Sequence, residues 1–261
     1  MHKPAMRKLY PAHSQLYLGP GRALYCGPIQ RLETHVYGAT VLHVGIYRPF
    51  RIRLAGGAWR AASCAIVPAG ISHALDLAGG VHGKLFVEKD GADAPGLCRR
   101  FPHPETAASF FEDKEAIDCF RRIYEEDPGR GAVEEWLDRL LLCPERQPWM
   151  PDARIRRVVE LIGREPDRNF SQEELAARIG LSPSRFLHLF RQQTGLPYRR
   201  FRQWKRMMSA FALLHATDSL TRAALDAGYA DATHFSHSFR ATFGVNPAPV
   251  FRTLGRFEMG S

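Results

Sequence analysis

The spacing of apolar and polar positions along the chain changes near residue 104. Before that point, short apolar runs are separated by glycine-containing breaks such as Gly56-Gly57 and Gly79-Gly80. Regularly spaced short strands with glycine turns favour a compact β-barrel or β-sandwich. The apolar runs predict strands over residues 40–47, 51–54, 63–68, 73–77 and 84–88.

After residue 104 the apolar spacing becomes helical. Residues 105–127 predict one helix, and residues 132–142 predict a second. The second helix carries one apolar stripe, made of Val133, Trp136, Leu137, Leu140 and Leu141. Such a stripe either packs on the barrel or forms a dimer contact, and the pattern favours neither. Three prolines then fall within residues 144–151, which predicts a linker over residues 146–151 between two domains.

The chain after the linker reads as helical throughout. Ser171 and Glu174 have the spacing of a capping box, with serine at the N-cap and glutamate at the third helical position. Ser182 is followed by a proline, which predicts a second N-cap with proline at the first helical position. Gly195 is placed to end that helix in the left-handed conformation. A helix, a glycine-containing turn and a second helix together predict a helix-turn-helix.

This pattern occurs twice. GLSPSRFLHLFRQQTG (180–195) and GYADATHFSHSFRATFG (228–244) align from glycine to glycine, with one extra residue in the second copy. The phenylalanines are core positions, whereas the outward positions carry side chains that suit base edges and phosphates. The outward positions are Ser184, Arg185, Leu187, His188 and Arg191 in the first copy and Ala232, Thr233, Ser236, His237 and Arg240 in the second. The two histidines share one aligned position, so they are the leading candidates for base reading.

Residues 199–216, between the copies, predict one long helix. At 1.5 Å per residue this helix is about 25 Å long, a rigid spacer for two recognition helices in successive major grooves. One protomer is then able to read an asymmetric site whose two elements lie about 10 bp apart.

The formal net charge is +9, and nearly all of the excess lies in the second half of the chain. Residues 146–261 hold 18 Lys and Arg against 10 Asp and Glu, and no acidic residue occurs from 175 to 217. A basic run by itself is equally well explained as a solvated face. Combined with the tandem pattern, it favours a polyanionic partner, namely double-stranded DNA.

Composition narrows the class of protein further. A chain of 261 residues with 45% hydrophobic and 24% charged residues is long enough for two domains with cores of their own. No apolar run is long enough to span a bilayer, and the N-terminus lacks the apolar core of a signal peptide. We therefore expect a cytoplasmic protein with no membrane partner. The five cysteines form no CxxC pair, which argues against a disulfide framework or a zinc ribbon.

In SQEELAARIGLSPSRFLHLFRQQTG and SLTRAALDAGYADATHFSHSFRATFGVNP the chain resembles the AraC/XylS family of transcription regulators. The resemblance covers residues 152–252, the whole DNA-binding module of that family. It implies that bases are read by Ser184, Leu187 and His188 and by Thr233, Ser236 and His237, with Arg191 and Arg240 near the backbone. Both histidines stand where the family very often has arginine, which implies a different target or pH-sensitive binding.

The resemblance also implies a set of partners and a role. These are double-stranded DNA, an unidentified small-molecule effector and RNA polymerase, with a homodimer left open. The role is regulation of transcription, either as an activator or as a repressor.

For residues 1–145 the resemblance implies a cupin-like barrel that senses a small molecule or mediates dimerisation. VPAGISH (67–73) matches part of the second cupin motif, but the first motif has Tyr37 in place of its second histidine. Only His35 and His73 match, whereas a metal site needs three or four converging ligands. We expect a sensor without a metal or cofactor, and His35, Tyr37 and His73 are the candidates for effector binding.

The predicted fold class is α+β, with an N-terminal cupin-like barrel and flanking helices before an all-α tandem helix-turn-helix domain with a long linking helix. The predicted function is sequence-specific regulation of transcription and not catalysis. Two alternatives stay open. One is a metal-dependent cupin enzyme with an accessory DNA-binding tail, in which His43 or His82 completes the metal site. The other is a non-specific nucleoid-type DNA-binding protein.

Overall fold

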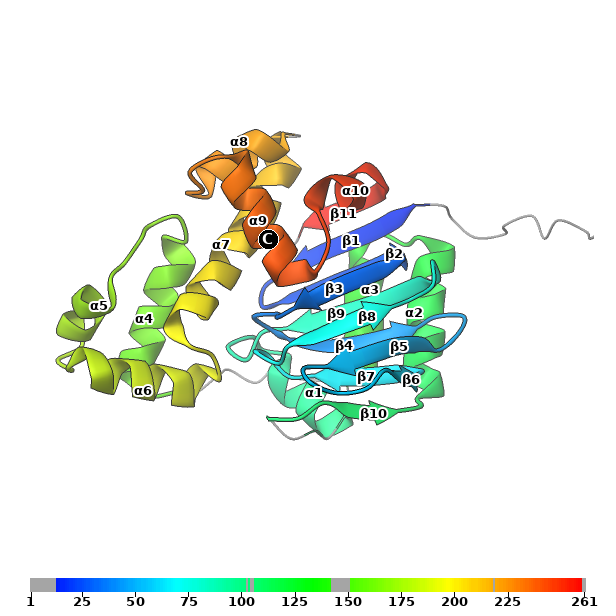
Figure 1. Ribbon diagram of the computed structural model, residues 1–261, viewed down its shortest axis with the longest axis horizontal. Coiled ribbons are helices and arrows are strands. Elements are labelled where there is room, and N and C mark those ends of the chain that lie inside the picture. The colour runs from blue at the N-terminus through cyan, green and yellow to red at the C-terminus, as the bar shows by residue number, and fades with distance from the viewer. Residues whose placement is uncertain (1–12, 102, 104–105, 142–150, 218, 260–261) are drawn as a thin grey trace, which may run out of the picture.

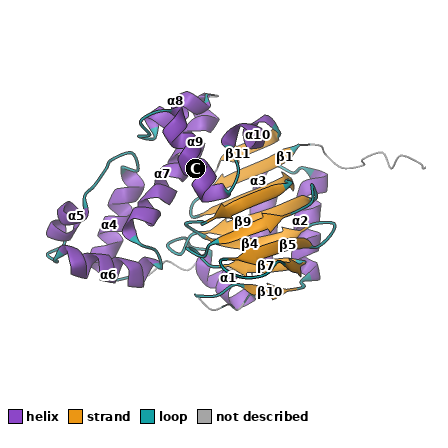
Figure 2. Cartoon of the chain, viewed as in Figure 1, coloured by secondary structure: helices purple, strands orange, loops and turns teal. Residues whose placement is uncertain are grey.

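The computed structural model describes residues 13–101, 103, 106–141, 151–217 and 219–259, which form two parts in contact with each other (Figure 1). Strands and a few helices make up the first part, and the second part is built from helices (Figure 2). The α+β class predicted from the sequence is therefore confirmed.

The first part contains two β-sheets whose inner faces share one apolar core. The larger sheet has the strand order β10-β7-β4-β9-β2-β1-β11, and the smaller has the order β3-β8-β5-β6. The strands of the larger sheet are β1 (Ser14–Gly19), β2 (Arg22–Pro28), β4 (Thr40–Gly45), β7 (Cys64–Val67), β9 (Val81–Val87), β10 (Ser109–Phe111) and β11 (Leu254–Met259). Those of the smaller sheet are β3 (Arg31–His35), β5 (Phe50–Leu54), β6 (Arg60–Ala62) and β8 (His73–Asp76). All five predicted strands are present, and the sequence pattern missed β1, β2, β3 and β6.

One predicted helix begins later than expected. Residues 109–111 were assigned to a helix from their apolar spacing, but they form β10, which pairs with β7. The helix α2 (Lys114–Glu126) starts after Asp113, whose carboxylate accepts a hydrogen bond from the Ala116 backbone N–H at 2.8 Å. This cap fixes the start of the helix, because the capping residue itself has extended backbone angles.

Helices α2 and α3 (Arg130–Leu140) cover the outer face of the larger sheet, and α1 (Ala94–Arg100) lies near its lower edge in Figure 1. Phe120 of α2 rests directly against Gly83 of β9, where a Cβ atom would collide with the ring. The stripe of α3 is buried at Val133, Leu137 and Leu140 and packs into the same cluster as Phe120. Of the two roles predicted for the stripe, packing on the sheet is the one that the structure shows.

The second part contains seven helices among the described residues. They are α4 (Ala153–Arg164), α5 (Gln172–Arg178), α6 (Pro183–Thr194), α7 (Tyr198–Thr217), α8 (Leu220–Asp226), α9 (Ala232–Phe243) and α10 (Pro247–Arg252). The long helix predicted between the repeats is α7, whose 20 residues correspond to about 30 Å. None of the helices described here is both long and apolar enough to cross a membrane.

After α10 the chain returns to the first part, which the sequence pattern did not predict. Strand β11 pairs in parallel with β1. Arg256 of β11 donates to Asp127 beyond the end of α2 at 2.6 Å, and Arg130 donates to the Met259 carbonyl at 2.7 Å. The larger sheet therefore contains residues from both sides of the helical part. Residues 146–150 of the predicted linker lie outside the described residues, so the division at 145 and 152 stays a prediction.

Candidate DNA-binding interface and its junction with the sheets

The first helix-turn-helix consists of α5 and α6, and its first cap forms as predicted. Ser171 Oγ accepts a hydrogen bond from the Glu174 backbone N–H at 3.0 Å. Only this half of the capping box is made, since the Glu174 carboxylate instead pairs with Arg168 and Arg178, each at 2.9 Å. The carboxylate thereby ties α5 to the segment that follows α4.

Both recognition helices, α6 and α9, begin at a side-chain cap and end at a left-handed glycine. Ser182 and Asp231 accept hydrogen bonds from the backbone N–H three residues on, at 3.4 and 2.7 Å. Gly195 and Gly244 have φ values of 78° and 72°, a conformation that glycine adopts without strain. The repeat read from the sequence is thus a repeat of helix ends in the structure.

The predicted DNA-contacting side chains lie on the outer surfaces of these two helices. Ser184, Arg185, His188, Arg191, Ala232, Thr233, His237 and Arg240 are exposed, and Leu187 and Ser236 are partly exposed. The aligned phenylalanines point the other way, and Phe186, Phe190, Phe235 and Phe239 are buried. The placement is compatible with base and phosphate contacts, and the individual roles stay predictions.

Three residues of the basic run are engaged inside the protein. Lys205 donates to Glu88 and Asp90 of the first part at 2.5 and 2.8 Å. Burial alone would lower the pKa of Lys205, but these two carboxylates raise it above its ordinary value. Arg202 and Arg206 donate to backbone carbonyls of the segment between α4 and α5. The charge of the run is therefore divided between holding the fold and facing solvent.

The first recognition helix borders a cleft of about 670 Å³ between the two parts. His188 and Arg191 of α6 line one side of it, and Lys89 and His103 of the first part line the other. This cleft carries basic side chains on both walls, so its field is attractive for anions.

The second recognition helix is docked on the sheets by its C-terminal end. The carbonyls of Gly244 and Ala241 accept hydrogen bonds from the backbone N–H groups of Glu33 and Val36, at 2.8 and 3.4 Å. A side chain at position 244 would collide with Glu33, so the close approach also requires glycine there. The exposed N-terminal half of α9 and its docked C-terminal half thus face different partners.

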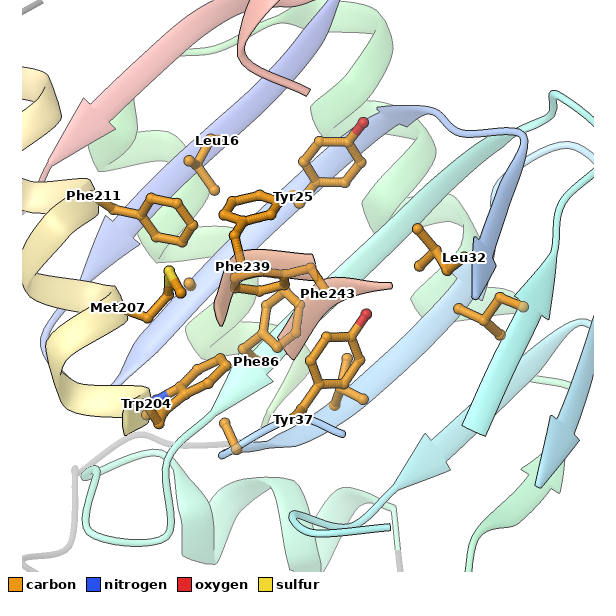
Figure 3. Packing of buried hydrophobic residues seen from close by; sticks show 14 of the residues in the cluster. Leu16, Tyr25, Leu32, Tyr37, Phe86, Trp204, Met207, Phe211, Phe239 and Phe243 are labelled. Atoms are coloured by element: carbon orange, nitrogen blue, oxygen red, sulfur yellow. The ribbon is translucent and has the colours of Figure 1, made fainter. Parts of the chain in front are cut away.

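Aromatic side chains from three elements fill this junction (Figure 3). Phe243 of α9 lies with ring centres 6.2 Å from Phe86 of β9, 6.1 Å from Trp204 and 5.6 Å from Phe211 of α7. Phe239 packs 4.7 Å from Phe243 on the same helix. The core of the second helix-turn-helix is therefore continuous with the core of the sheets.

A model of the helix-turn-helix domain matches residues 175–253 of this chain. The arabinose operon regulatory protein of Escherichia coli is 33% identical over 157 residues, 53% of this chain and 53% of its own length. The transcriptional activator RhaS of Escherichia fergusonii is 34% identical over 100 residues, 38% of this chain and 36% of its own. The helix-turn-helix part of this chain is thus similar to that of AraC-type transcription regulators. The chain spans about half of the first relative and about a third of the second.

The fold of both parts together is similar to that of ToxT from Vibrio cholerae. The apo structure has a TM-score of 0.65 at 10% identity and covers 91% of this chain and 99% of its own. A ToxT structure with a bound unsaturated fatty acid has a TM-score of 0.56 at 10% identity, covering 93% and 95%. The chain thus shares a two-part fold with a protein of very different sequence.

The three candidates for effector binding are brought together between the two sheets. The ring centres of His35 and Tyr37 are 4.4 Å apart, and those of His35 and His73 are 4.3 Å apart. All three are buried, and His35 Nε2, His73 Nε2 and the Tyr37 hydroxyl have no hydrogen-bond partner in the described part of the chain. Burial lowers the pKa of His73 to about 4 and that of His35 well below its ordinary value.

Two more histidines lie beside this group, but no metal site results. His43 Nδ1 and His82 Nε2 are 3.1 Å apart, and burial lowers the pKa of both imidazoles. No group of three His, Cys, Asp or Glu within the described ranges is arranged to hold a metal ion. The rings of these histidines pack against one another at tilted or edge-on angles.

Sequence reasoning missed one polar residue of this interior, Lys84. It lies on β9 between His82 and Phe86, and only 4% of its surface is exposed. The sequence offered little signal for it, because a lysine at the start of an apolar run is normally a solvated strand end. Its position borders a cavity that the helices of the DNA-binding part complete.

Proposed function

We propose that this protein is a sequence-specific DNA-binding regulator of transcription whose N-terminal part responds to a small molecule. The observation that carries the proposal is the pair of capped recognition helices, α6 and α9, with their outward side chains exposed and a 20-residue helix between them. Helices of this kind enter the major groove with the outer side chains of their N-terminal turns against base edges.

The roles of the outer side chains follow from their chemistry. We infer base reading by Ser184, Leu187 and His188 on α6 and by Thr233, Ser236 and His237 on α9. Arg185, Arg191 and Arg240 suit phosphates, because a guanidinium pairs with an anion regardless of the neighbouring base. A neutral imidazole presents one donor and one acceptor. We therefore expect a histidine to bind the edge of adenine or guanine less tightly than an arginine does.

The response to a small molecule is supported by the way the second recognition helix is attached. Its C-terminal end is hydrogen-bonded to Glu33 of β3 and to Val36 just after it, and its phenylalanines share a core with the sheets. A ligand that binds between the parts therefore alters the free energy of this attachment. The bound fatty acid of ToxT supports a ligand site in a protein of this fold. RNA polymerase and a second copy of the chain are the protein partners that we infer for such a regulator.

The proposal is tested by comparing two neighbouring variants on two kinds of DNA. A target is first selected from a random-sequence duplex library, and affinities are measured by fluorescence anisotropy on the target and on random DNA. We expect the wild-type protein to prefer its target by about 10³ or more. His188→Ala should cost about 1–3 kcal/mol on the target and little on random DNA.

Arg191→Ala provides the contrast to this result. It should weaken both DNAs to a similar extent and reduce the slope of log affinity against log salt by about 1. Arg139→Ala, on the exposed face of α3, is the matched control and should change neither. Equal losses on target and random DNA for His188→Ala would remove its role in base reading. Absence of any preferred target would favour the non-specific alternative.

A further inference from the structure

Lys84 is a buried cation without a counter-charge. No carboxylate of the described residues forms a salt bridge with it, and its Nζ lies 5.4 Å from the centre of the Tyr25 ring. Burial lowers the pKa of Lys84 to about 7. Lys205, the other buried lysine at the junction, is satisfied by Glu88 and Asp90. The contrast shows that the fold is able to pair a buried lysine and does not do so at position 84.

The groups that surround Lys84 are neutral or apolar on every side. From the strands come Tyr25, His43 and His82, and the two imidazoles have pKa values lowered by burial. His35 and His73 lie farther along the same interior and are also held neutral. The wall built by α7, α9 and α10 holds no charged residue where it faces the cavity, and it consists of Trp204, Met208, Phe211, Phe239, Phe243, Val250 and Phe251.

The cavity beside Lys84 is small but continues outward. Its volume is about 60 Å³, enough for little more than a headgroup. A cleft of about 400 Å³ between the β1–β2 hairpin and α7 adjoins it. Five residues line both spaces, namely Leu18, Ala23, Phe86, Trp204 and Met208. Together the two spaces fall in the size range of ordinary small-molecule sites, which are about 300–1,000 Å³.

We propose that this protein binds an anionic amphiphile, with a carboxylate at Lys84 and an unbranched apolar chain that passes Ala23 and Met208 into the adjoining cleft. The proposal deepens the proposed function by naming the chemical class of the effector, and it rests on that function only for the consequence of binding. A carboxylate supplies the negative charge that the protein does not place beside the Lys84 ammonium. A charge-assisted hydrogen bond in an apolar site is among the stronger hydrogen bonds. The chain gains burial against the apolar part of the lining, whereas Arg22, Glu88 and Lys205 also border the outer cleft.

Such a ligand would touch both parts of the protein at once. Its chain would lie against Met208 and Trp204 of α7, while its headgroup would lie on β9. A ligand bound in this way stabilises one particular arrangement of α7 and α9 on the sheets by its binding free energy. The site is thus located where ligand binding and the arrangement of the recognition helices share the same contacts.

The test uses the full chain, freed of lipid by extraction, and a series of ten-carbon probes kept below their micelle concentrations. Isothermal titration calorimetry should show one site for decanoate. Decanol and decyltrimethylammonium should bind about tenfold more weakly or worse, because neither supplies a negative charge. Decyl sulfate, which keeps the charge, should bind. This comparison distinguishes an anion site from a general apolar one.

Two variants localise the site. Lys84→Met should lower the affinity for decanoate by about tenfold to a hundredfold, while Lys89→Met, five residues along the same segment, should leave it unchanged. Met208→Trp keeps the lysine but narrows the passage between cavity and cleft, so it should weaken decanoate more than acetate. Circular dichroism confirms that each variant is folded before its affinity is compared.

A pH series supplies a readout that apolar binding elsewhere would not give. Decanoate is ionised throughout the range from pH 6 to 9, whereas Lys84 of the free protein loses its proton above about pH 7. Binding should therefore take up a proton above that pH. The affinity should fall by about tenfold for each further pH unit until the pKa of the occupied site is reached. In Lys84→Met this dependence should disappear.

Several results would overturn the proposal. They are equal affinity for decanol and decanoate, unchanged affinity in Lys84→Met, or no binding of octanoate, decanoate or dodecanoate. None of these measurements involves DNA, so the ligand site and the DNA-binding function fail independently. If decanoate binds at Lys84 but no target DNA is preferred, the ligand site stands and the regulatory function falls. If a target is preferred but decanoate does not bind, the reverse holds.

Discussion

Replacing Lys84 with methionine is expected to raise the free energy of unfolding of the ligand-free protein by about 4 kcal/mol at pH 7. The pKa of this ammonium is about 7 in the folded protein against 10.5 for an ordinary lysine, so folding works against its protonation. Methionine fills a similar volume without a charge to desolvate. Urea unfolding of the two proteins at pH 7, followed by circular dichroism, measures the difference.

The sign of the effect can be followed with pH. The penalty is fully present below pH 7, declines as pH rises towards 10.5 and is absent above it. The difference in free energy of unfolding between the variant and the wild-type protein should therefore shrink by about 1.4 kcal/mol for each pH unit in that interval. A variant less stable than the wild-type protein at pH 7 would show that the ammonium is compensated in the fold.

Lys205→Met is the matched control, because it removes a buried lysine that has partners. It leaves the carboxylates of Glu88 and Asp90 buried without their cation, and it should destabilise the protein by about 3 kcal/mol or more. Two lysines at one junction are thus expected to respond in opposite directions to the same substitution. A stabilising Lys84→Met together with a destabilising Lys205→Met would show that the fold does not need a cation at position 84, as the proposed ligand site requires.

Phe239→Ala should have an effect of similar size and opposite sign. We expect it to lower the free energy of unfolding by roughly 3–5 kcal/mol. The ring is 2% exposed and packs between Phe235, Phe243, Phe211 and Phe251, so truncation leaves a cavity where α7, α9 and α10 meet. Urea unfolding measures the loss. Hydrogen exchange followed by mass spectrometry then shows where protection is lost, and we expect increases in α9, in α7 and in the strands beneath them.

Phe190→Ala is the comparison for this prediction. Phe190 is fully buried in the first helix-turn-helix, whose core is a separate cluster with Ile155, Ile162 and Phe186. Its loss should be similar in size but should increase exchange chiefly in α4, α5 and α6. If Phe239→Ala also changed exchange only within its own helix, the second recognition helix would not be energetically joined to the sheets.

The features that could be predicted from the sequence are those set by neighbouring residues. Ser182, Gly195 and Gly244 define helix ends through contacts within one or two turns, and each acts in the structure as its spacing indicates. The tandem repeat is visible because both copies need the same caps and the same buried phenylalanines. The outward positions then follow from helical periodicity alone.

The features that could not be predicted depend on segments far apart in the chain. The basic run from 175 to 217 predicts a surface for DNA. Lys205 instead forms salt bridges with Glu88 and Asp90 of the first part, which lie opposite it in the fold. Lys84 stands at the start of the apolar run 84–88, where a lysine is normally solvated. Both faces of β9 are covered instead, one by α2 and the other by the smaller sheet with α7 and α9. No local sequence pattern predicts that these distant segments pack together.

Strand β11 sets the order in which this protein is able to fold during synthesis. Ser14 of β1 bonds to Thr253 just before β11, 239 residues further along the chain. The helical part is made between these two segments, so the edge of β1 stays open while all of α4 to α10 leaves the ribosome. An open strand edge is a template for pairing with other chains. Closure of that edge is a long-range contact and hence a slow one. The nascent chain is therefore exposed to misassembly at β1 until β11 covers this strand.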